Sequence, residues 1–207
     1  MPAGAGIHEL AHAVADCRGC DLWKDATQAV FSSGGPDAQV VLVGEQPGDQ
    51  EDRVGKPFVG PAGQLLDRAL IDAGIDRGRA YVTNAVKHFR FSRTSASGRR
   101  IHQTPDLAHM EACRPWLEAE LAVVDPQVVV CLGATAAKAL ISPTFRVTRQ
   151  RGTLIPREGL GEDAGVHSGW WLATIHPSAV LRADDRDGAY RGLVADLRVV
   201  ADVLQAD

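Results

Sequence analysis

Three short polar runs in this sequence carry side chains that could take part in catalysis. Residues 44–49 (GEQPGD) follow an apolar run, His102 ends a basic segment, and residues 176–178 (HPS) lie near the C-terminus. Glycine-rich turns between a strand and a helix bind many phosphates through backbone N–H groups. Carboxylates stabilise developing positive charge, and a neutral imidazole is a good nucleophile at pH 7. The three runs therefore predict a catalytic site that accepts a phosphate-bearing substrate.

The segment of residues 86–102 is basic. It contains no Asp or Glu, and its cationic residues are Lys87, Arg90, Arg93, Arg99 and Arg100. The whole chain has a formal net charge of −4 at pH 7, which argues weakly against a nucleic-acid partner. A local basic segment on an acidic body nevertheless suits a short, focused contact with phosphates. Its Ser, Thr and Gly content predicts a long loop, and long loops in compact domains are often functional.

The length and composition of the chain indicate a single domain over residues 1–207. With 45% hydrophobic and 23% charged residues, the chain can enclose one sizeable core but not two. The chain does not begin with a charged leader and an apolar stretch, and no window approaches the roughly 20 apolar residues of a membrane span. We therefore expect a cytoplasmic protein that has no membrane partner and acts as a monomer.

Apolar runs alternate with amphipathic segments along the chain. The runs predict strands, and the segments predict helices. Strands are expected at residues 40–43, 80–83, 128–132 and 170–175, and helices at 7–16, 61–74, 106–123, 134–140 and 187–204. This order predicts an α/β fold, a three-layer α/β/α sandwich with a central, mainly parallel four-stranded sheet. Ligands of such sheets bind at the carboxyl ends of the strands, where residues 44–49 and 176–178 fall.

Five motifs, found in one order along the chain, resemble the uracil-DNA glycosylase superfamily and in particular its iron–sulfur branch. They are residues 44–49, 56–61 (KPFVGP), 83–88 (TNAVKH), 99–102 (RRIH) and 176–178. The RRIH motif lies between the strand that carries the Asn and the helix that carries a cysteine, and it resembles the UdgX-type enzymes. The resemblance implies that uracil-containing DNA is the partner. Single-stranded DNA is the expected form, and double-stranded DNA is the alternative.

The resemblance assigns a uracil pocket to Gly44, Phe58, Asn84 and His176. Phe58 would stack on the base, and the Asn84 amide would pair with the uracil edge and reject cytosine. Glu45 and His176 match the carboxylate near the sugar and the donor to uracil O2. Taken alone, each residue also fits an ordinary structural role, Phe58 as core filler and Asn84 as a strand-end cap.

His102 is the nucleophile that the resemblance implies. In the UdgX-type group this histidine attacks the sugar C1′ after uracil leaves, and the protein stays joined to the abasic site. Asp49 completes the catalytic loop, and Gln46 occupies the place of the water-activating Asp of the best-known branch, which disfavours ordinary hydrolysis. Arg100 would fix the loop of His102. From its residue type alone, His102 also fits a phosphate contact or a solvated position.

The resemblance also implies a set of residues that contact DNA. Leu181 and Arg182 are candidates for filling the gap that a flipped base leaves in the stack. A proline-started helix with a nearby capping serine is the ordinary alternative for residues 176–178. The complete set is Lys87, Arg99, Arg100, Ser178, Leu181 and Arg182.

Four cysteines in a chain without a secretory signal favour metal or core roles over disulfides. By the resemblance, Cys17, Cys20 and Cys113 hold a structural [4Fe–4S] cluster, and His88 is the fourth ligand where the branch usually has Cys. A zinc site with the same four ligands fits the spacing as well. Cys131 lies in an expected central strand and is assigned to the core.

Two other functions remain open for this sequence. One is a conventional glycosylase that releases uracil, leaves a free abasic site and turns over. The other is a catalytically weak protein that binds DNA lesions with the same pocket and does not cleave. Release of free uracil separates the binding protein from both enzymes, and a heat-stable adduct separates the two enzymes.

Overall fold

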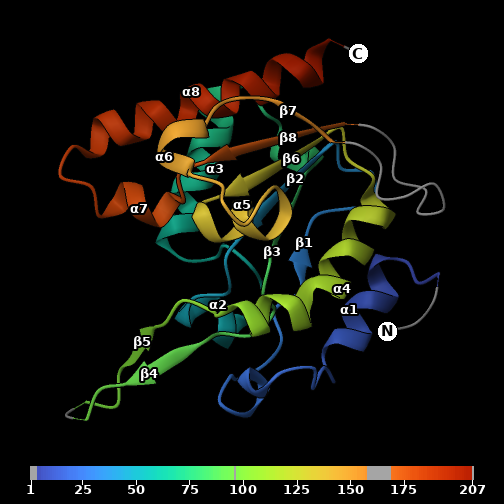
Figure 1. The fold of residues 1–207 in the computed structure, drawn as a ribbon, viewed down its shortest axis with the longest axis vertical. Helices are drawn as coiled ribbons and strands as arrows, with labels where there is room; N and C mark the ends of the chain where they lie inside the picture. The colour runs from blue at the N-terminus through green and yellow to red at the C-terminus, as the bar shows by residue number, and fades with distance from the viewer. Residues whose placement is uncertain (1–3, 96, 158–168, 207) are drawn as a thin grey trace.

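The computed structural model describes residues 4–95, 97–157 and 169–206. At its centre is a sheet with the strand order β1-β3-β2-β6-β8-β7 (Figure 1). The strands are β1 (Ser32–Ser33), β2 (Val40–Gly44), β3 (Ala80–Asn84), β6 (Val128–Leu132), β7 (Ile155–Arg157) and β8 (Gly169–Thr174). The four inner strands are parallel, and the edge strands β1 and β7 are antiparallel to their neighbours. The predicted α/β fold with a mainly parallel sheet is confirmed.

The central sheet has six strands, so the expected number of four is wrong. The four predicted strands are the inner ones, and apolar runs identify them because helices cover both of their faces. The two missed strands, β1 and β7, contain only two and three residues. Such short edge strands carry no periodic pattern of apolar residues from which a strand can be predicted.

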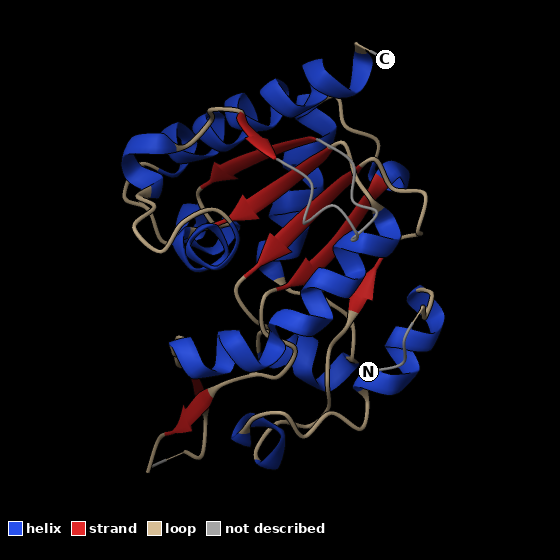
Figure 2. Ribbon diagram, turned by 45° about the vertical axis from the view of Figure 1, so that its right-hand side comes forward, coloured by secondary structure: helices blue, strands red, loops and turns tan. Residues whose placement is uncertain are grey.

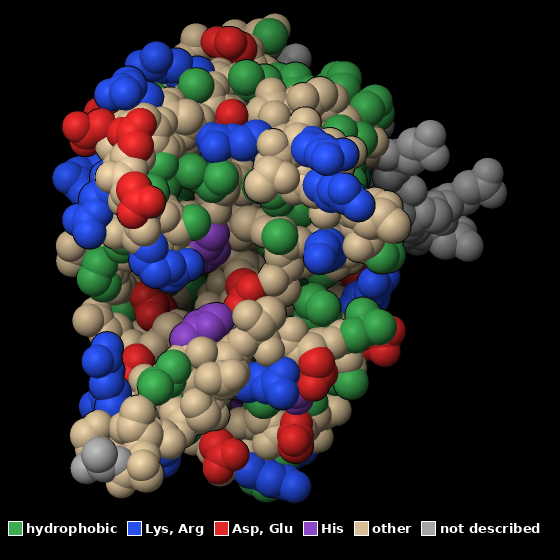
Figure 3. Space-filling model, turned by 60° about the vertical axis from the view of Figure 1, so that its left-hand side comes forward, with side chains coloured by type: hydrophobic (Ala, Val, Ile, Leu, Met, Phe, Trp, Pro, Cys, Tyr) green, Lys and Arg blue, Asp and Glu red, His purple; other side chains and the backbone are tan. Residues whose placement is uncertain are grey.

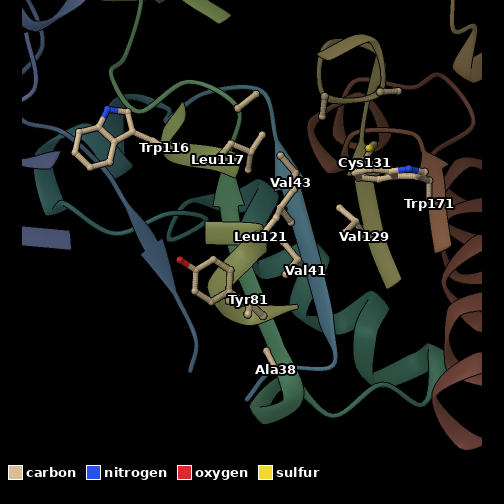
Figure 4. Close-up of a cluster of buried hydrophobic side chains, with 14 of the residues drawn as sticks. Ala38, Val41, Val43, Tyr81, Trp116, Leu117, Leu121, Val129, Cys131 and Trp171 are labelled. Atoms are coloured by element: carbon tan, nitrogen blue, oxygen red, sulfur yellow. The ribbon is translucent and has the colours of Figure 1, made fainter. Parts of the chain in front are cut away.

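Helices cover both faces of the sheet (Figure 2). Side chains alternate along each strand, so that Val41 of β2 packs against one layer of helices and Val40 against the other. The first layer comprises α1 (Ile7–Val14), α4 (Leu107–Val124), α5 (Ala134–Leu140) and α6 (Val147–Gln150). The second comprises α3 (Pro61–Ala73), α7 (Pro177–Leu181) and α8 (Arg186–Gln205). Figure 4 shows Leu117 and Leu121 of α4 in the core of the first layer.

A two-stranded antiparallel hairpin stands apart from the central sheet. It consists of β4 (Phe91–Arg93) and β5 (Arg100–His102), and Phe91 pairs with His102. The hairpin projects from the body of the molecule beside α2 (Asp49–Val54) (Figure 1). The segment expected to be a long loop is therefore partly a hairpin, which gives His102 a fixed place on a strand. Two 3-10 turns, Asp21–Lys24 and Arg77–Arg79, complete the described elements.

The carboxyl ends of the inner strands meet at one edge of the sheet. Gly44 pairs with Asn84 at the ends of β2 and β3, and Leu132 pairs with Thr174 at the ends of β6 and β8. The residues that follow these ends therefore lie close together although they are far apart in the sequence. In the part of the chain that is described, no helix is long and apolar enough to cross a membrane.

Candidate active site

A cavity of about 550 Å³ opens at the carboxyl ends of the strands. Figure 3 shows a hollow on one face of the molecule in which histidine and acidic side chains gather. The cavity walls come from the ends of the inner strands, from β5 of the hairpin and from the start of α7. Eight of the predicted site residues line it: Glu45, Gln46, Phe58, Asn84, His102, His176, Ser178 and Arg182.

Phe58 and Asn84 line the cavity, and both side chains pack against Gly44. A Cβ atom on Gly44 would overlap Asn84 Oδ1 and lie 2.7 Å from Phe58 Cζ, so only glycine fits between these side chains. Phe58 has φ +55, and a Cβ on Gly63 would overlap the Phe58 carbonyl group, so α3 can approach this strained residue only through a glycine. Asn84 is 2% exposed, and its side chain lines the cavity. A carboxamide at this position offers both a donor and an acceptor to a bound ligand.

His176 enters the cavity as a neutral imidazole. Its Nδ1 accepts a hydrogen bond from Ser178 N at 3.1 Å and lies 2.7 Å from Ser178 Oγ. Nδ1 therefore carries no proton, and Nε2 does. Burial lowers the pKa of His176 to about 4, although the nearby Glu45 carboxylate opposes this shift. At neutral pH the ring presents an Nε2–H donor, and its centroid lies 6.0 Å from that of Phe58.

Glu45 lies between His102 and Thr135. Its Oε1 is 3.2 Å from His102 Nε2, and its Oε2 accepts a hydrogen bond from Thr135 Oγ1. Burial raises the pKa of Glu45, but the hydrogen bonds from His102 and Thr135 outweigh burial and hold the pKa below its usual value. The Glu45 side chain is 20% exposed and that of His102 is 49% exposed. A carboxylate and a solvent-accessible imidazole thus face each other at the open side of the cavity.

Gln46 ties the base of the hairpin to the loop after β2. Its Oε1 accepts a hydrogen bond from Arg90 N at 2.9 Å, and its Nε2 donates to Arg90 O at 3.2 Å and to Gln103 O at 3.0 Å. Gln103 follows His102 directly. The amide is fully engaged with the backbone on both sides of the hairpin, so Gln46 positions the hairpin strand that carries His102.

Arg100 packs its side chain against α2, and its expected contact with DNA stays a prediction. Its side chain is 7% exposed, pairs with the Asp49 and Asp52 carboxylates and lies 5.0 Å from the Phe91 ring centroid. The parallel expectation that Arg100 fixes the hairpin agrees with these contacts. Asp49, expected to be catalytic, binds Arg100 and Arg53 and is not among the residues that line the cavity.

Lys87 is fully buried, so its expected contact with DNA is wrong. Its Nζ pairs with the Glu120 carboxylate, donates to Thr83 Oγ1 at 2.7 Å and donates to Asn84 O at 2.9 Å. Glu120 also accepts a hydrogen bond from Tyr81 at 2.9 Å. Glu120 was missed in the sequence, although its position in α4 is on the buried stripe of that helix. The pair anchors the end of β3, from which Asn84 enters the cavity.

The remaining residues predicted to contact DNA differ in their surroundings. Arg99 is exposed near the tip of the hairpin, and Arg182 is exposed at the rim of the cavity. Ser178 is engaged with His176. Leu181 is partly buried against the core of the second layer, which leaves only part of its side chain accessible. These four assignments remain predictions.

The predicted cysteine ligands lie against α4. None of Cys17, Cys20 and Cys113 forms a disulfide. Cys20 packs against the small apolar cluster that contains Cys113, and Cys17 Sγ accepts a hydrogen bond from Trp116 Nε1 at 3.3 Å. Burial raises the pKa of Cys113 to about 11, so this thiol is protonated at neutral pH unless a metal binds it.

His88 is buried, and its Nδ1 has no hydrogen-bond partner within the described structure. His88 follows Lys87, the residue that anchors β3. A buried imidazole nitrogen without a hydrogen-bond partner has the chemistry of a metal ligand. Among the described residues, however, no three His, Cys, Asp or Glu side chains are gathered closely enough to hold a metal ion. Cys131 is fully buried in β6, where it packs in the core of the first layer.

Comparison with known proteins identifies the family of this chain. A profile described as the Uracil DNA glycosylase superfamily matches residues 31–198. The chain is 35% identical to a type-4 uracil-DNA glycosylase of Pyrobaculum aerophilum over 89% of its own length and 88% of the relative. It is 34% identical to one of Thermotoga maritima, over 88% and 86% of the two chains. A third, of Archaeoglobus fulgidus, is 33% identical over 84% and 83%. The chain, with its cavity at the carboxyl ends of a parallel sheet, belongs to the uracil-DNA glycosylase superfamily.

Proposed function

We propose that this protein is a uracil-DNA glycosylase that excises uracil and then becomes covalently linked to the abasic site through His102. The observation that carries the proposal is the 3.2 Å contact of His102 Nε2 with Glu45 Oε1 beside the cavity that holds Phe58 and Asn84. The similarity to three proteins named type-4 uracil-DNA glycosylases supports the excision step. The covalent step rests on the position of His102.

Recognition in this proposal takes place on a base that is flipped out of the DNA. Phe58 stacks on one face of the base, and the absence of a side chain on Gly44 lets Phe58 and Asn84 approach each other in the pocket. The Asn84 amide accepts from uracil N3–H and donates to uracil O4. Cytosine presents an unprotonated N3 and an amino group at these positions, so the same amide orientation leaves it unpaired, and a buried unpaired group is costly.

Cleavage breaks the bond between uracil N1 and deoxyribose C1′, and the bonding electron pair leaves with uracil. His176 donates its Nε2–H to uracil O2, where negative charge develops. The low pKa of His176 keeps the ring neutral, so this donor stays in its correct form at neutral pH. The Glu45 carboxylate stabilises the positive charge that forms at C1′ and O4′ of the sugar.

Capture follows when the unprotonated ring nitrogen of His102 donates its electron pair to C1′ and forms a C–N bond. The ring then carries a positive charge, and its remaining N–H proton passes to a carboxylate or to solvent, which leaves a neutral N-glycosyl imidazole. Glu45 is the carboxylate within reach of the ring. A nucleophile held at the site has a large advantage over bulk water. Gln46 does not compete by activating water, because its amide is bonded to the hairpin backbone.

The proposal includes a structural [4Fe–4S] cluster on Cys17, Cys20, His88 and Cys113. The three thiols close to α4 and the unpartnered His88 Nδ1 support it, and zinc on the same ligands is the alternative. The bound cluster would join the N-terminal segment to α4 and to the segment that leads into the hairpin. It supplies no chemistry to base excision, and none of the steps above passes through it.

The proposal is tested by a denaturing gel of the protein after incubation with a labelled oligonucleotide that contains one uracil. Single-stranded and double-stranded forms are compared, with thymine in place of uracil as the substrate control. The variant His102→Ala is compared with His8→Ala, which removes an exposed histidine of α1. We expect a uracil-dependent band that survives heat and detergent for the native protein and for His8→Ala. We expect His102→Ala to form no adduct and to release uracil over many turnovers.

Each other result excludes a part of the proposal. An adduct that persists in His102→Ala refutes His102 as the nucleophile. DNA that breaks at the uracil position only after alkali, without an adduct to the native protein, indicates a conventional glycosylase that turns over. DNA that is bound but unchanged indicates a protein that recognises lesions without cleavage.

A further inference from the structure

Thr135 contacts the catalytic carboxylate and was not singled out in the sequence. It is the second residue of α5, which begins after β6, and Glu45 follows β2. β2 and β6 are neighbouring parallel strands, so the loops after their carboxyl ends lie side by side. The Thr135 hydroxyl donates to Glu45 Oε2 rather than to the backbone of its own helix. This hydrogen bond thus joins the first turn of α5 to the segment after β2, and its two residues are 90 positions apart in the sequence.

We propose that Thr135 is a positioning residue that holds the Glu45 carboxylate in the orientation in which Oε1 faces His102. The inference rests on the proposed function, in which Glu45 acts at the sugar. A hydrogen bond to one oxygen of a carboxylate restricts rotation of the planar group and so restricts the position of the second oxygen. The Thr135 hydroxyl is itself held, because a β-branched side chain in a helix has few χ1 rotamers. Without this bond, Glu45 would be free to turn away from His102 toward solvent.

The charged groups around Glu45 determine how the loss of the Thr135 hydroxyl would change the ionisation of the Glu45 carboxylate. The hairpin contributes His102, the segment after β8 contributes His176, α7 is followed by Arg182, and α2 contributes Glu51 to the same cavity. The Glu51 carboxylate accepts hydrogen bonds from Gly48 N at 3.1 Å and from Gly60 N at 2.8 Å. Among the described residues, the side chains that hydrogen-bond to the Glu45 carboxylate are His102 at Oε1 and Thr135 at Oε2. Removal of the Thr135 hydroxyl takes away one donor to the ionised Glu45 carboxylate. The burial of Glu45, which favours the protonated form, is then opposed by fewer interactions.

The matched variants are Thr135→Val, which removes the hydroxyl at nearly constant shape, and Thr135→Ser, which keeps it. The first measurement is a ¹³C NMR titration of the Glu45 side-chain carboxyl group in the free protein, with the signal assigned by Glu45→Gln. We expect the midpoint of Glu45 to move to higher pH in Thr135→Val and to stay at the native position in Thr135→Ser. An unchanged midpoint in Thr135→Val overturns the inference, whether or not the protein forms an adduct.

The second measurement is the single-turnover rate with uracil-containing DNA as a function of pH, with uracil release and adduct formation followed in the same samples. At neutral pH we expect Thr135→Val to be slower by about tenfold, the usual effect of losing one hydrogen bond to a charged group, with unchanged Kd for DNA. The acidic limb of the pH–rate profile of Thr135→Val should also have its midpoint at a higher pH than that of the native protein. Thr135→Ser should restore both the rate and the pH profile. Equal rates and pH profiles for Thr135→Val and the native protein contradict the inference. Uracil release without adduct in the native protein refutes only the covalent step, and Thr135 is then judged on the release rate.

Discussion

Burial keeps the imidazole of His176 neutral, and this property makes the fold sensitive to acid. Its pKa is about 4 in the folded protein, compared with about 6.5 in an unfolded chain. Between these values the unfolded state binds a proton that the folded state does not, so the free energy of unfolding falls as pH falls through this window. The loss from this residue is at most about 3 kcal/mol.

The prediction for His176 is checked by urea denaturation at several pH values between 7 and 4. Asn in its place can still cap α7, because its side-chain oxygen can accept from Ser178 N. We expect the native protein to lose more stability than His176→Asn as pH falls from 6.5 to 4. Identical slopes for the two proteins would show that His176 is not held neutral by the fold.

Gly44 gives a second prediction about a single residue. Its missing side chain leaves the space between Asn84 and Phe58, and a Cβ atom there would overlap Asn84 Oδ1. We expect Gly44→Ala to lower the single-turnover rate on uracil-containing DNA by about a hundredfold, because the base could no longer reach the Asn84 edge in the correct position. Gly35→Ala is the control, since a Cβ atom on Gly35 meets no atom within 4 Å. A rate for Gly44→Ala close to that of the control would exclude this site as the base pocket.

At the level of elements, the hairpin places His102, and Arg100 holds the hairpin. The Arg100 guanidinium is buried between α2 carboxylates and the aromatic rings at the start of β4. Removal of one partner of a buried ion pair typically costs about 3–5 kcal/mol. We expect Arg100→Gln to free the hairpin from α2 and to separate the two chemical steps. Uracil release should remain within a few fold of the native rate, while adduct formation falls at least about tenfold.

The neighbouring Arg99 provides the control for this prediction. It is exposed, so Arg99→Gln should weaken DNA binding in a salt-dependent way and leave the ratio of adduct to released uracil unchanged. Hydrogen exchange of residues 91–102 should become faster in Arg100→Gln and not in Arg99→Gln. An equal ratio of adduct to released uracil in the two variants would mean that the contacts of Arg100 with α2 do not position His102.

The elements differ in how far the sequence predicts them. The inner strands and the main helices were predicted within two residues of their observed ends, because continuous apolar runs and 3.6-residue periodicity mark buried elements. The short edge strands and the hairpin were not predicted, because they bury too little to show a pattern. The motif residues Glu45, Asn84 and His176, which follow or end inner strands, line one cavity in the structure.

Predictions from the sequence miss the environment of a residue where ion pairs between distant segments of the chain decide it. Lys87 and Arg100 were both assigned to DNA because they lie in a basic segment. Their partners Glu120 and Asp52 are 33 and 48 residues away in the chain, and the fold brings them together inside the protein. A local charge count treats every cation as exposed, and it therefore overestimates the charge that the hairpin segment offers to phosphates. Thr135 was missed for the same reason, since only the pairing of β2 with β6 brings it to Glu45.

At the scale of the whole molecule, the proposed cluster would stabilise the N-terminal segment more than the sheet. The two main apolar cores consist of the strands and the helices that cover them, and Cys20 and Cys113 lie in a third, smaller cluster. We expect the purified protein to contain about four iron atoms per chain and no zinc. Cys113→Ser should lose the iron and melt at a lower temperature, yet keep the circular-dichroism spectrum of the α/β fold. The control Cys131→Ala should retain the iron, and stoichiometric zinc in the native protein would contradict the iron assignment.

In our proposal, the folded molecule directs the imidazole of His102 to the sugar carbon that uracil leaves. The most direct test is peptide mapping by mass spectrometry of the heat-stable product formed with a uracil-containing oligonucleotide. We predict that the deoxyribose remnant is attached to the peptide that contains His102, and that fragmentation places it on the imidazole of that residue. A remnant on any other residue, or the absence of a covalent product under conditions in which uracil is released, would contradict the account.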